Sequence, residues 1–272
     1  MELSPILQAV LSMGGIGFIF AVLLTIANKT LKVEGNPKVE KVEEALPGID
    51  CGACGYPSCE GCAKAMVEGE AEVTVCSVSN EEGYQEIADI LGVEYGTGER
   101  EVAVVLCQGG DGVVKTKSHY EGVSSCMAAT FAGGGERACQ YGCIGKGDCV
   151  EVCDFDAIYM NEKNLPVVDR EKCTGCGKCV EACPRDIIEL HSINHHAFVL
   201  CKNEDEGKKA RQVCDNACIG CGLCVKFDDS DAFIMENNLA SNDQEKYDKT
   251  YELPTDKCPT GCLVLVGEKD EE

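Results

Sequence analysis

The longest apolar stretch of the chain lies at its N-terminus. No charged residue occurs between positions 3 and 28, and Leu, Ile, Val, Phe, Ala and Gly dominate residues 6–26. At about 1.5 Å of rise per residue, this stretch would form a helix about 31 Å long, which matches the apolar thickness of a bilayer. The pattern therefore predicts a transmembrane helix within residues 1–28.

The charges beside this stretch predict its orientation. Glu2 precedes it, whereas Lys29 and Lys32 follow it. A secretory signal peptide would carry positive charge before the apolar run and a small-residue cleavage site after it. Because positive charge marks the cytoplasmic flank of a span, we expect the N-terminus outside the cell membrane and everything after Lys29 on the cytoplasmic side.

The remaining chain consists of short apolar stretches separated by polar ones. Residues 29–46 include the charged run VEGNPKVEKVEE and are expected to form a linker. A short helix is predicted for Ser58 to Val67. The runs VAVVLC and AFVLC, which end at Cys107 and Cys201, are typical of buried strands.

Cysteine content decides the class of this protein. The 272 residues include 22 cysteines, no tryptophan and 6% aromatic residues. Such a density indicates disulfide bridges or bound metal, and gaps of two and three residues place several sulfurs around one small object. We expect several small modules, each folded around a metal group in a reducing compartment. The net charge of −23 argues against a nucleic-acid partner, since phosphate is bound by concentrated Lys and Arg.

The first cysteine group has the spacing C-x2-C-x4-C-x16-C. Its glycine-rich loop, DCGACGYPSC, allows the backbone to wrap closely around a ligand. Four thiolates suit a [4Fe–4S] cluster and also a tetrahedral zinc ion, and the spacing alone leaves both open. Cys62 is left over in this group and is expected to be a buried thiol. The expected ligands are Cys51, Cys54, Cys59 and Cys76.

The most specific motif is C-x2-C-x2-C-x3-C-P, formed by Cys173, Cys176, Cys179, Cys183 and Pro184. In this ferredoxin pattern three close thiolates hold one cluster, and the fourth reaches the neighbouring cluster of a pair. The same spacing suits a single tetrahedral ion poorly. A partner motif is therefore expected elsewhere in the chain.

The partner motif lies just upstream and is altered. Counting back from Cys153 by the usual spacing gives Cys149, Lys146 and Cys143, so one thiol is missing. Cys139, four residues before Cys143, is expected to take the missing place. One predicted cluster is bound by Cys139, Cys143, Cys149 and Cys183, and the other by Cys153, Cys173, Cys176 and Cys179.

An internal repeat predicts a second unit of the same kind. Residues 139–160 and 214–235 match without a gap, since both begin C-x3-C-I-G and end in Asp-Ala-x2-Met. In the second unit one cluster site has lost its thiolates, and its four expected ligand positions are Asp228, Asp248, Tyr251 and Pro254. The other site is complete with Cys218, Cys221, Cys224 and Cys258.

Six cysteines have no assignment: Cys62, Cys107, Cys126, Cys201, Cys214 and Cys262. One interpretation is a fifth cluster on Cys107, Cys126, Cys201 and Cys214, and the other is thiols packed as small apolar side chains. No G-x-G-x-x-G motif follows a strand, and no His–Cys pairs have Rieske spacing. We therefore expect electron-carrying clusters and no catalytic residue on this chain.

The order of these motifs resembles the B subunit of the Rnf complex, a membrane-bound ferredoxin:NAD+ oxidoreductase. The resemblance covers nearly the whole chain, including the segment CQYGCIGKGDCVEVC. It implies an α+β chain with a transmembrane helix, a small [4Fe–4S] domain and two ferredoxin-like βαβ-repeat units, the second lacking one cluster site. The expected boundaries are 1–28 for the helix, 29–46 for the linker, 47–100 for the small domain, 101–138 for a connecting segment, and 139–200 and 201–272 for the two units.

The resemblance also implies a function. Electrons would pass from reduced soluble ferredoxin through four [4Fe–4S] clusters, or five, to other membrane subunits of an ion-translocating oxidoreductase, a translocase of the inner cell membrane. The alternatives are an electron-transfer subunit of another membrane complex such as a hydrogenase, a structural zinc protein and a secreted disulfide protein. A candidate docking surface for ferredoxin, with a plain solvated loop as the alternative, consists of Lys202, Lys208, Lys209 and Arg211.

Overall fold

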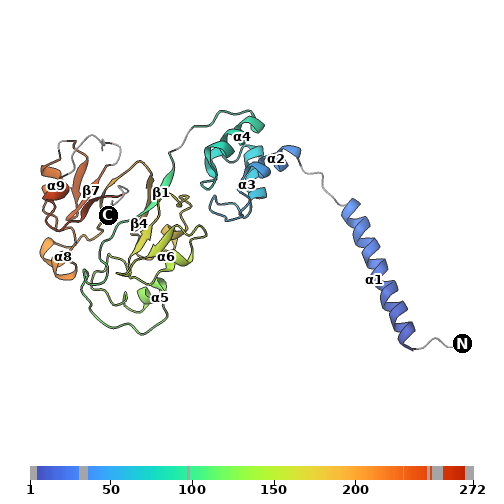
Figure 1. Ribbon diagram of the computed structural model, residues 1–272, viewed down its shortest axis with the longest axis horizontal. Helices are drawn as coiled ribbons and strands as arrows, with labels where there is room; N and C mark the ends of the chain where they lie inside the picture. Colours follow the sequence, from blue (N-terminus) through green and yellow to red (C-terminus); the bar gives the residue numbers. More distant parts are fainter. Residues whose placement is uncertain are drawn as a thin grey trace.

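The computed structural model describes residues 5–30, 36–96, 99–228, 230–243, 246 and 254–266. Over these residues the chain contains both helices and strands (Figure 1). Each of these strands pairs with one antiparallel partner. This mixed content agrees with the expected α+β class. Lys32, Asp248 and Tyr251, which were used in the predictions, lie outside the described residues.

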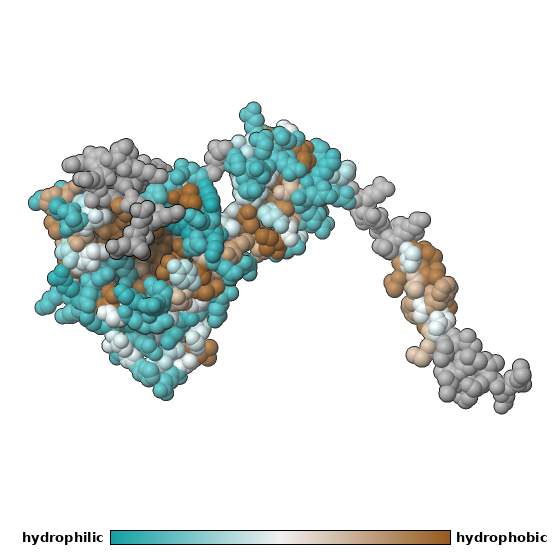
Figure 2. Space-filling model, viewed as in Figure 1, coloured by the Kyte–Doolittle hydropathy of each residue, from teal (hydrophilic) through white to brown (hydrophobic). Residues whose placement is uncertain are grey.

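The predicted N-terminal helix is present as α1, Pro5–Thr30. All side chains from Met13 to Ile26 are exposed, and Figure 2 shows much of this segment as hydrophobic. Within the part of the chain that the structure describes, no helix is both long enough and apolar enough to cross a membrane.

A small helical domain follows. Its elements are α2, Pro37–Ala45; α3, Cys59–Glu68; η1, Val73–Val75; and α4, Glu81–Leu91. Helix α2 packs against both α3 and α4. The helix predicted for 58–67 is confirmed as α3, which begins after its capping residue Ser58.

The prediction of a linker at 29–46 is wrong for α2. Asn36 caps this helix by accepting the N–H of Lys38 at 3.1 Å, and Pro37 occupies its first turn. Val42 is fully buried and Leu46 is 6% exposed, so one apolar face packs into the small domain. Residues 31–35 of the expected linker lie outside the described residues.

The first unit follows the small domain. Its elements are β1, Glu101–Val105; α5, Cys126–Phe131; α6, Asp148–Glu151; β2, Ile158–Met160; β3, Pro166–Val168; α7, Lys178–Glu181; and β4, Ile188–Ser192. Strand β1 pairs with β4, and β2 pairs with β3.

The second unit repeats this order. Its elements are β5, Ala197–Val199; α8, Gly207–Val213; α9, Leu223–Lys226; β6, Phe233–Glu236; β7, Leu239–Asn242; η2, Thr255–Lys257; and β8, Leu263–Leu265. Strand β5 pairs with β8, and β6 pairs with β7.

Strand pairing moves two of the expected boundaries. Because β1 pairs with β4, the segment 101–138 supplies the first strand of the first unit and is more than a connection. Because β5 pairs with β8, the second unit includes residues 197–200. The cysteine motifs that suggested boundaries at 139 and 201 mark the loops of each unit, whereas its outer strands lie further apart in the sequence.

Candidate metal centres

Cysteines of the two units line cavities of nearly equal size. Three of these cavities enclose about 350 to 370 Å³ each, counting space open to solvent, and at least four cysteines line each one. Four thiolates are the ligand set of a [4Fe–4S] cluster, so the donor chemistry and the repeated size fit the same cofactor. Among the described residues, no group of three or more His, Cys, Asp or Glu side chains is arranged to hold a single metal ion.

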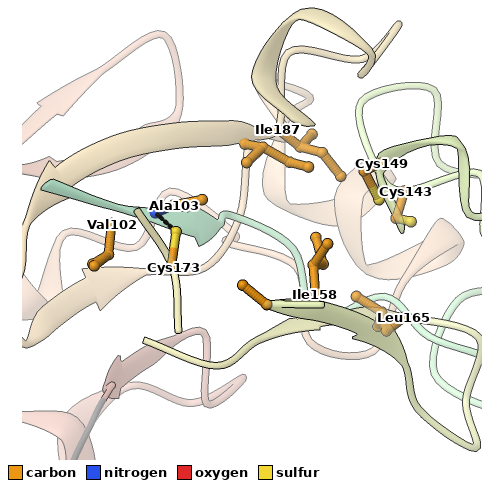
Figure 3. Close-up of a cluster of buried hydrophobic side chains, with 10 residues drawn as sticks. Val102, Ala103, Cys143, Cys149, Ile158, Leu165, Cys173 and Ile187 are labelled. Atoms are coloured by element: carbon orange, nitrogen blue, oxygen red, sulfur yellow. Dashed lines mark hydrogen bonds between the residues drawn. The ribbon is translucent and has the colours of Figure 1, made fainter. Parts of the chain in front are cut away.

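One cavity in the first unit brings together four cysteines that were grouped from their spacing: Cys153, Cys173, Cys176 and Cys179. Gly175 forms the tight turn of this loop with φ of +70°, and a Cβ there would lie 2.6 Å from the carbonyl oxygen of Glu101. The N–H of Ala103 in β1 donates to Cys173 Sγ at 3.4 Å (Figure 3). The loop and β1 together position the thiols of this site.

A second cavity in the first unit differs from the prediction by one cysteine. Its cysteines are Cys126, Cys143, Cys149 and Cys183. Cys139 was expected in this group, but it lines a different cavity, between the two units. Cys183 lines the same cavity as Cys143 and Cys149 of the upstream motif. Cys153 lines the same cavity as Cys173 and Cys176 of the downstream motif, so each motif supplies one thiol to the other's site.

Asp148 explains how Cys126 reaches this cavity. Its carboxylate accepts the N–H of Cys126 at 2.7 Å and that of Met127 at 3.1 Å. Burial opposes ionisation of this carboxyl, but hydrogen bonds from these groups and from Ser125 outweigh it and hold the pKa of Asp148 below its ordinary value. Asp148 begins α6, so these bonds fix the start of α5 beside it and bring Cys126 near Cys149. This is a tertiary contact that no motif spacing encodes.

Apolar side chains separate the two sites of the first unit. Ile158 and Ile187 lie between Cys173 on one side and Cys143 and Cys149 on the other (Figure 3). Ile187 is 1% exposed. Such packing excludes water, and solvent exposure is one of the factors that set the potential of a cluster.

The second unit has a cavity lined by Cys218, Cys221, Cys224, Cys258 and Cys262. The Sγ atoms of Cys258 and Cys262 are 3.6 Å apart, and a hydrogen bond from the Cys262 thiol lowers the pKa of Cys258 to about 4. Leu200 donates to the carbonyl oxygen of Cys262 at 2.7 Å, as Leu106 does to that of Ile187. Cys262 thus takes the place of the buried Ile187 of the first unit. This equivalence favours a role for Cys262 as a hydrogen-bond donor to Cys258 over a role as a fifth ligand.

The thiols of the small domain gather around the start of α3. Asp50 accepts the N–H of Cys59 at 2.6 Å, which fixes the loop that precedes the helix. Cys62, expected to be a buried thiol, is 1% exposed. Burial, followed by the nearby charge of Cys54, raises the pKa of Cys62 to about 12, and Cys76 and Cys59 add to this shift. Three of the four predicted ligands therefore surround one buried thiol.

The fourth predicted ligand of the small domain, Cys51, lies near Lys178 of the first unit. Lys178 at the start of α7 donates to Asp154 at 2.5 Å, which raises the pKa of Lys178, and the negative charges of Cys51 and Cys176 add smaller contributions. Cys176 and Lys178 line the same cavity of the first unit. Cys51 therefore lies within electrostatic reach of that site.

The candidate docking residues lie on α8 and just before it. Lys202 donates to Glu189 of β4, so it ties the second unit to the first. Lys208, Lys209 and Arg211 are exposed on α8.

Two family models match parts of the chain. Residues 46–78 match the family described as "Putative Fe-S cluster", and residues 166–189 match the "4Fe-4S binding domain" family. These matches cover the loop of the small domain and the ferredoxin motif of the first unit. Together with the cysteine-lined cavities, they identify [4Fe–4S] clusters as the cofactors of this protein.

Full-length relatives are similar over most of the chain. It is 44% identical over 261 residues to the B subunit of the Na+-translocating ferredoxin:NAD+ oxidoreductase complex of Acetobacterium woodii, covering 96% of this chain and 78% of the relative. It is 40% identical over 243 residues to the B subunit of the ion-translocating oxidoreductase complex of Methanosarcina acetivorans, covering 89% and 92%. It is 37% identical over 267 residues to the B subunit of the proton-translocating ferredoxin:NAD+ oxidoreductase complex of Clostridium ljungdahlii, covering 97% and 94%.

Proposed function

The chain belongs to the family of B subunits of ion-translocating oxidoreductase (Rnf) complexes, and on this premise we propose that it carries electrons from reduced ferredoxin to the membrane subunits of such a complex. Two of its relatives are named as subunits of ferredoxin:NAD+ oxidoreductases. Each bound cluster supplies one-electron oxidation and reduction. The residues of this chain hold the clusters, exclude water from them and supply hydrogen bonds to their sulfurs. No catalytic residue is part of the proposal.

The observation that carries this proposal is the succession of sites along the molecule. Cys51 of the small domain lies within electrostatic reach of Lys178, beside the first site of the first unit. Cys149 of the next site lies within reach of Cys183 and also of Cys179, so the two sites of the first unit are neighbours. Electron transfer weakens steeply with distance, so neighbouring centres are what a relay requires.

Anaerobic mixing of the purified full-length protein with reduced ferredoxin tests the proposal. We expect electron paramagnetic resonance signals of this protein's reduced clusters to develop while those of reduced ferredoxin decline. Dithionite, which reduces clusters without a docking step, serves as the control. Reduction by dithionite but not by ferredoxin would contradict ferredoxin as the electron donor.

The N-terminal helix is proposed to anchor the protein in the inner cell membrane. The absence of charge between positions 3 and 28 and the exposure of the apolar side chains from Met13 to Ile26 support this role. Lys29 would lie on the cytoplasmic flank, with the cluster domains on the same side.

Membrane fractionation tests the anchor. The full-length protein should stay with the membrane after an alkaline carbonate wash, and a variant that lacks residues 5–30 should be released. A membrane-impermeant thiol label applied to intact cells should miss the cluster domains. Release of the full-length protein by carbonate, or efficient labelling from outside, would contradict the anchor or its orientation.

A further inference from the structure

A fourth cavity of the same size lies between the two units. It encloses about 360 Å³, counting space open to solvent, as the cavities of the other sites do. Cys143 lies at its border, because that residue also lines the neighbouring cavity of the first unit. The four other cysteines that line it belong to none of the sites described above: Cys107, Cys139, Cys201 and Cys214.

These four thiols come from equivalent places in the two units. Cys107 stands two residues after the end of β1, and Cys201 stands two residues after the end of β5. Cys139 and Cys214 each stand four residues before a C-I-G motif. Each unit therefore contributes one thiol after its first strand and one before its first cysteine loop, and the site is nearly symmetric.

Backbone N–H groups point at the strand-end sulfurs of both units. Cys107 Sγ accepts the N–H of Gly109 at 3.3 Å and that of Cys143 at 3.4 Å. Cys201 Sγ accepts the N–H of Asn203 at 3.4 Å and that of Cys218 at 3.2 Å. A neutral thiol is a weak acceptor, whereas hydrogen bonds to a charged group are the strong ones. Two donors on each sulfur suit a metal-bound thiolate better than a thiol packed as an apolar side chain.

The surroundings of the sulfurs point the same way. Asn203, only 1% exposed, donates from Nδ2 to Cys139 Sγ at 3.6 Å. The sulfurs of Cys107 and Cys214 lie close to the same backbone position, since a Cβ at Gly109 would be 3.5 Å from each.

Of the two cysteines that compete for this site, the structure selects Cys139. Cys126 was the alternative considered from the sequence, but it lines the cavity of Cys149 and Cys183. Cys143 is the equivalent of Cys218, whose sulfur faces the cavity of the second unit, so Cys143 belongs with the first unit's own site.

We propose that these four cysteines bind a [4Fe–4S] cluster that the two units share, with two thiolates from each. Cys143 and Cys218 donate their N–H groups to this site, while their own sulfurs line the cavities on either side. A cluster held here would supply one-electron oxidation and reduction between the sites on either side. It thereby connects the clusters of the first unit with that of the second. The site does not depend on ferredoxin being the donor.

Iron analysis and electron paramagnetic resonance of single alanine variants test this site. Cys107→Ala and Cys214→Ala alter different units, yet each should lose about four irons per chain and the same reduced-cluster signal. Val104→Ala is the control, since it removes a buried apolar side chain of β1 that lines none of the cysteine cavities described above, and it should keep the wild-type iron content. Wild-type iron in both variants, or loss of two different signals, would overturn the shared site.

Native mass spectrometry of the wild-type full-length protein covers the case in which a variant does not fold. Under anaerobic conditions we expect the mass of five [4Fe–4S] clusters, about twenty irons per chain. The mass of four clusters, alone or with one zinc ion, would overturn the proposal. Neither experiment involves ferredoxin, so their failure leaves the electron donor untouched.

Discussion

The first and second units pair their outer strands alike, β1 with β4 in one and β5 with β8 in the other. Leu106, which follows β1, donates its N–H to the carbonyl oxygen of Ile187 beside β4 at 2.7 Å. Leu200, which follows β5, donates in the same way to Cys262 beside β8, also at 2.7 Å. The residue two positions before the inner hairpin takes a left-handed conformation in both, with φ of 49° at Asp156 and 53° at Asp231. The backbone frames of the two units are therefore equivalent.

The units differ at one candidate ligand position, which is Cys153 in the first unit and Asp228 in the second. Cys153 lines a cysteine cavity in the first unit, whereas the equivalent Asp228 makes hydrogen bonds to its own loop. The Asp228 carboxylate accepts the N–H of Ala232 at 2.6 Å and of Phe233 at 2.9 Å, and the hydroxyl of Ser230 at 2.6 Å. In the second unit the Asp228 carboxylate therefore fixes this loop by hydrogen bonds. In the first unit the same loop position is a candidate cluster ligand, Cys153.

This difference separates the requirements of the fold from those of electron transfer. Strand pairing and the hairpin survive without the second cluster, because hydrogen bonds at Asp228 fix the loop. The cysteines that the second unit keeps line its own cavity and the cavity between the units. The second unit therefore keeps the thiols of these two cavities, and Asp228 takes the place of one ligand of the other site.

The largest effect is expected from the crossing thiols of the first unit. Cys183→Ala should remove the cluster beside Cys149 and spare the one beside Cys173, while Cys153→Ala should do the reverse. Each variant should lose about four irons per chain, because a cluster that has lost a thiolate is no longer held. In the second unit, Cys258→Ala should remove a single cluster. If Cys183→Ala instead removes the cluster beside Cys173, the grouping of these thiols is wrong.

Asp228→Ala should loosen the inner hairpin of the second unit. Loss of its hydrogen bonds removes about 1–3 kcal/mol of local stability, which corresponds to roughly ten- to a hundredfold faster amide exchange at Ala232 and Phe233. Hydrogen–deuterium exchange measures this. Asp154→Ala is the control, because its ion pair with Lys178 is half-exposed and screened by solvent, so its loss should change stability little. Equal exchange in the two variants would show that Asp228 does not hold the loop.

The same loop should respond to acid. Burial opposes ionisation of Asp228, but hydrogen bonds from Ser230, Phe233 and Ala232 outweigh it and lower its pKa. Because the folded-state pKa is lowered, the stabilisation is present above the ordinary carboxyl pKa of about 3.9 and is lost as the pH falls through the lower folded value. The protection of the hairpin amides, taken relative to their intrinsic exchange rates at each pH, should therefore fall more steeply on acidification in the wild type than in Asp228→Asn, which has no charge to lose. An identical acid response in both would exclude this role for the charge.

Cys262→Ala should change the second unit's cluster without removing it. Iron content should equal that of the wild type, because Cys262 takes the place of the apolar Ile187. The midpoint potential should become more negative, since one hydrogen bond to a cluster sulfur is lost. A redox titration followed by electron paramagnetic resonance measures both. Loss of about four irons would instead make Cys262 a ligand.

The smallest effect is expected from the basic surface of α8. Ala210 of this helix is buried beside Cys139 and Cys214, so α8 covers the proposed shared site. Reversing Lys208 and Lys209 to glutamate should raise KM for ferredoxin several-fold at low salt and less at high salt, because ions screen exposed charges. The control reverses two exposed lysines of α2, at positions 38 and 41. An equal change in KM in both variants would remove α8 as the docking surface.

Local spacing predicted the sites whose ligands are close in sequence. Cys173, Cys176 and Cys179 belong to one loop, so their spacing alone places them around one object. Helix α2 was missed because its charges dominate the pattern, although Val42 and Leu46 supply a buried face.

The choice between Cys126 and Cys139 depended on tertiary contacts. Asp148 brings Cys126 to its cavity through hydrogen bonds to the start of α5, which no spacing reports. The repeat did pair Cys139 with Cys214, and this pairing could have indicated a common role. Cys126 and Cys201 are separated by the same offset as Cys139 and Cys214, but hydrogen bonding makes Cys201 the equivalent of Cys107.

An anomalous difference map at the iron absorption edge, from anaerobic crystals of the full-length protein, tests this arrangement most directly. We expect one group of iron peaks in the small domain, two in the first unit, one in the second unit and one between the units, surrounded by Cys107, Cys139, Cys201 and Cys214. No iron should lie beside Asp228. Iron beside Asp228, or its absence between the units, would contradict the account.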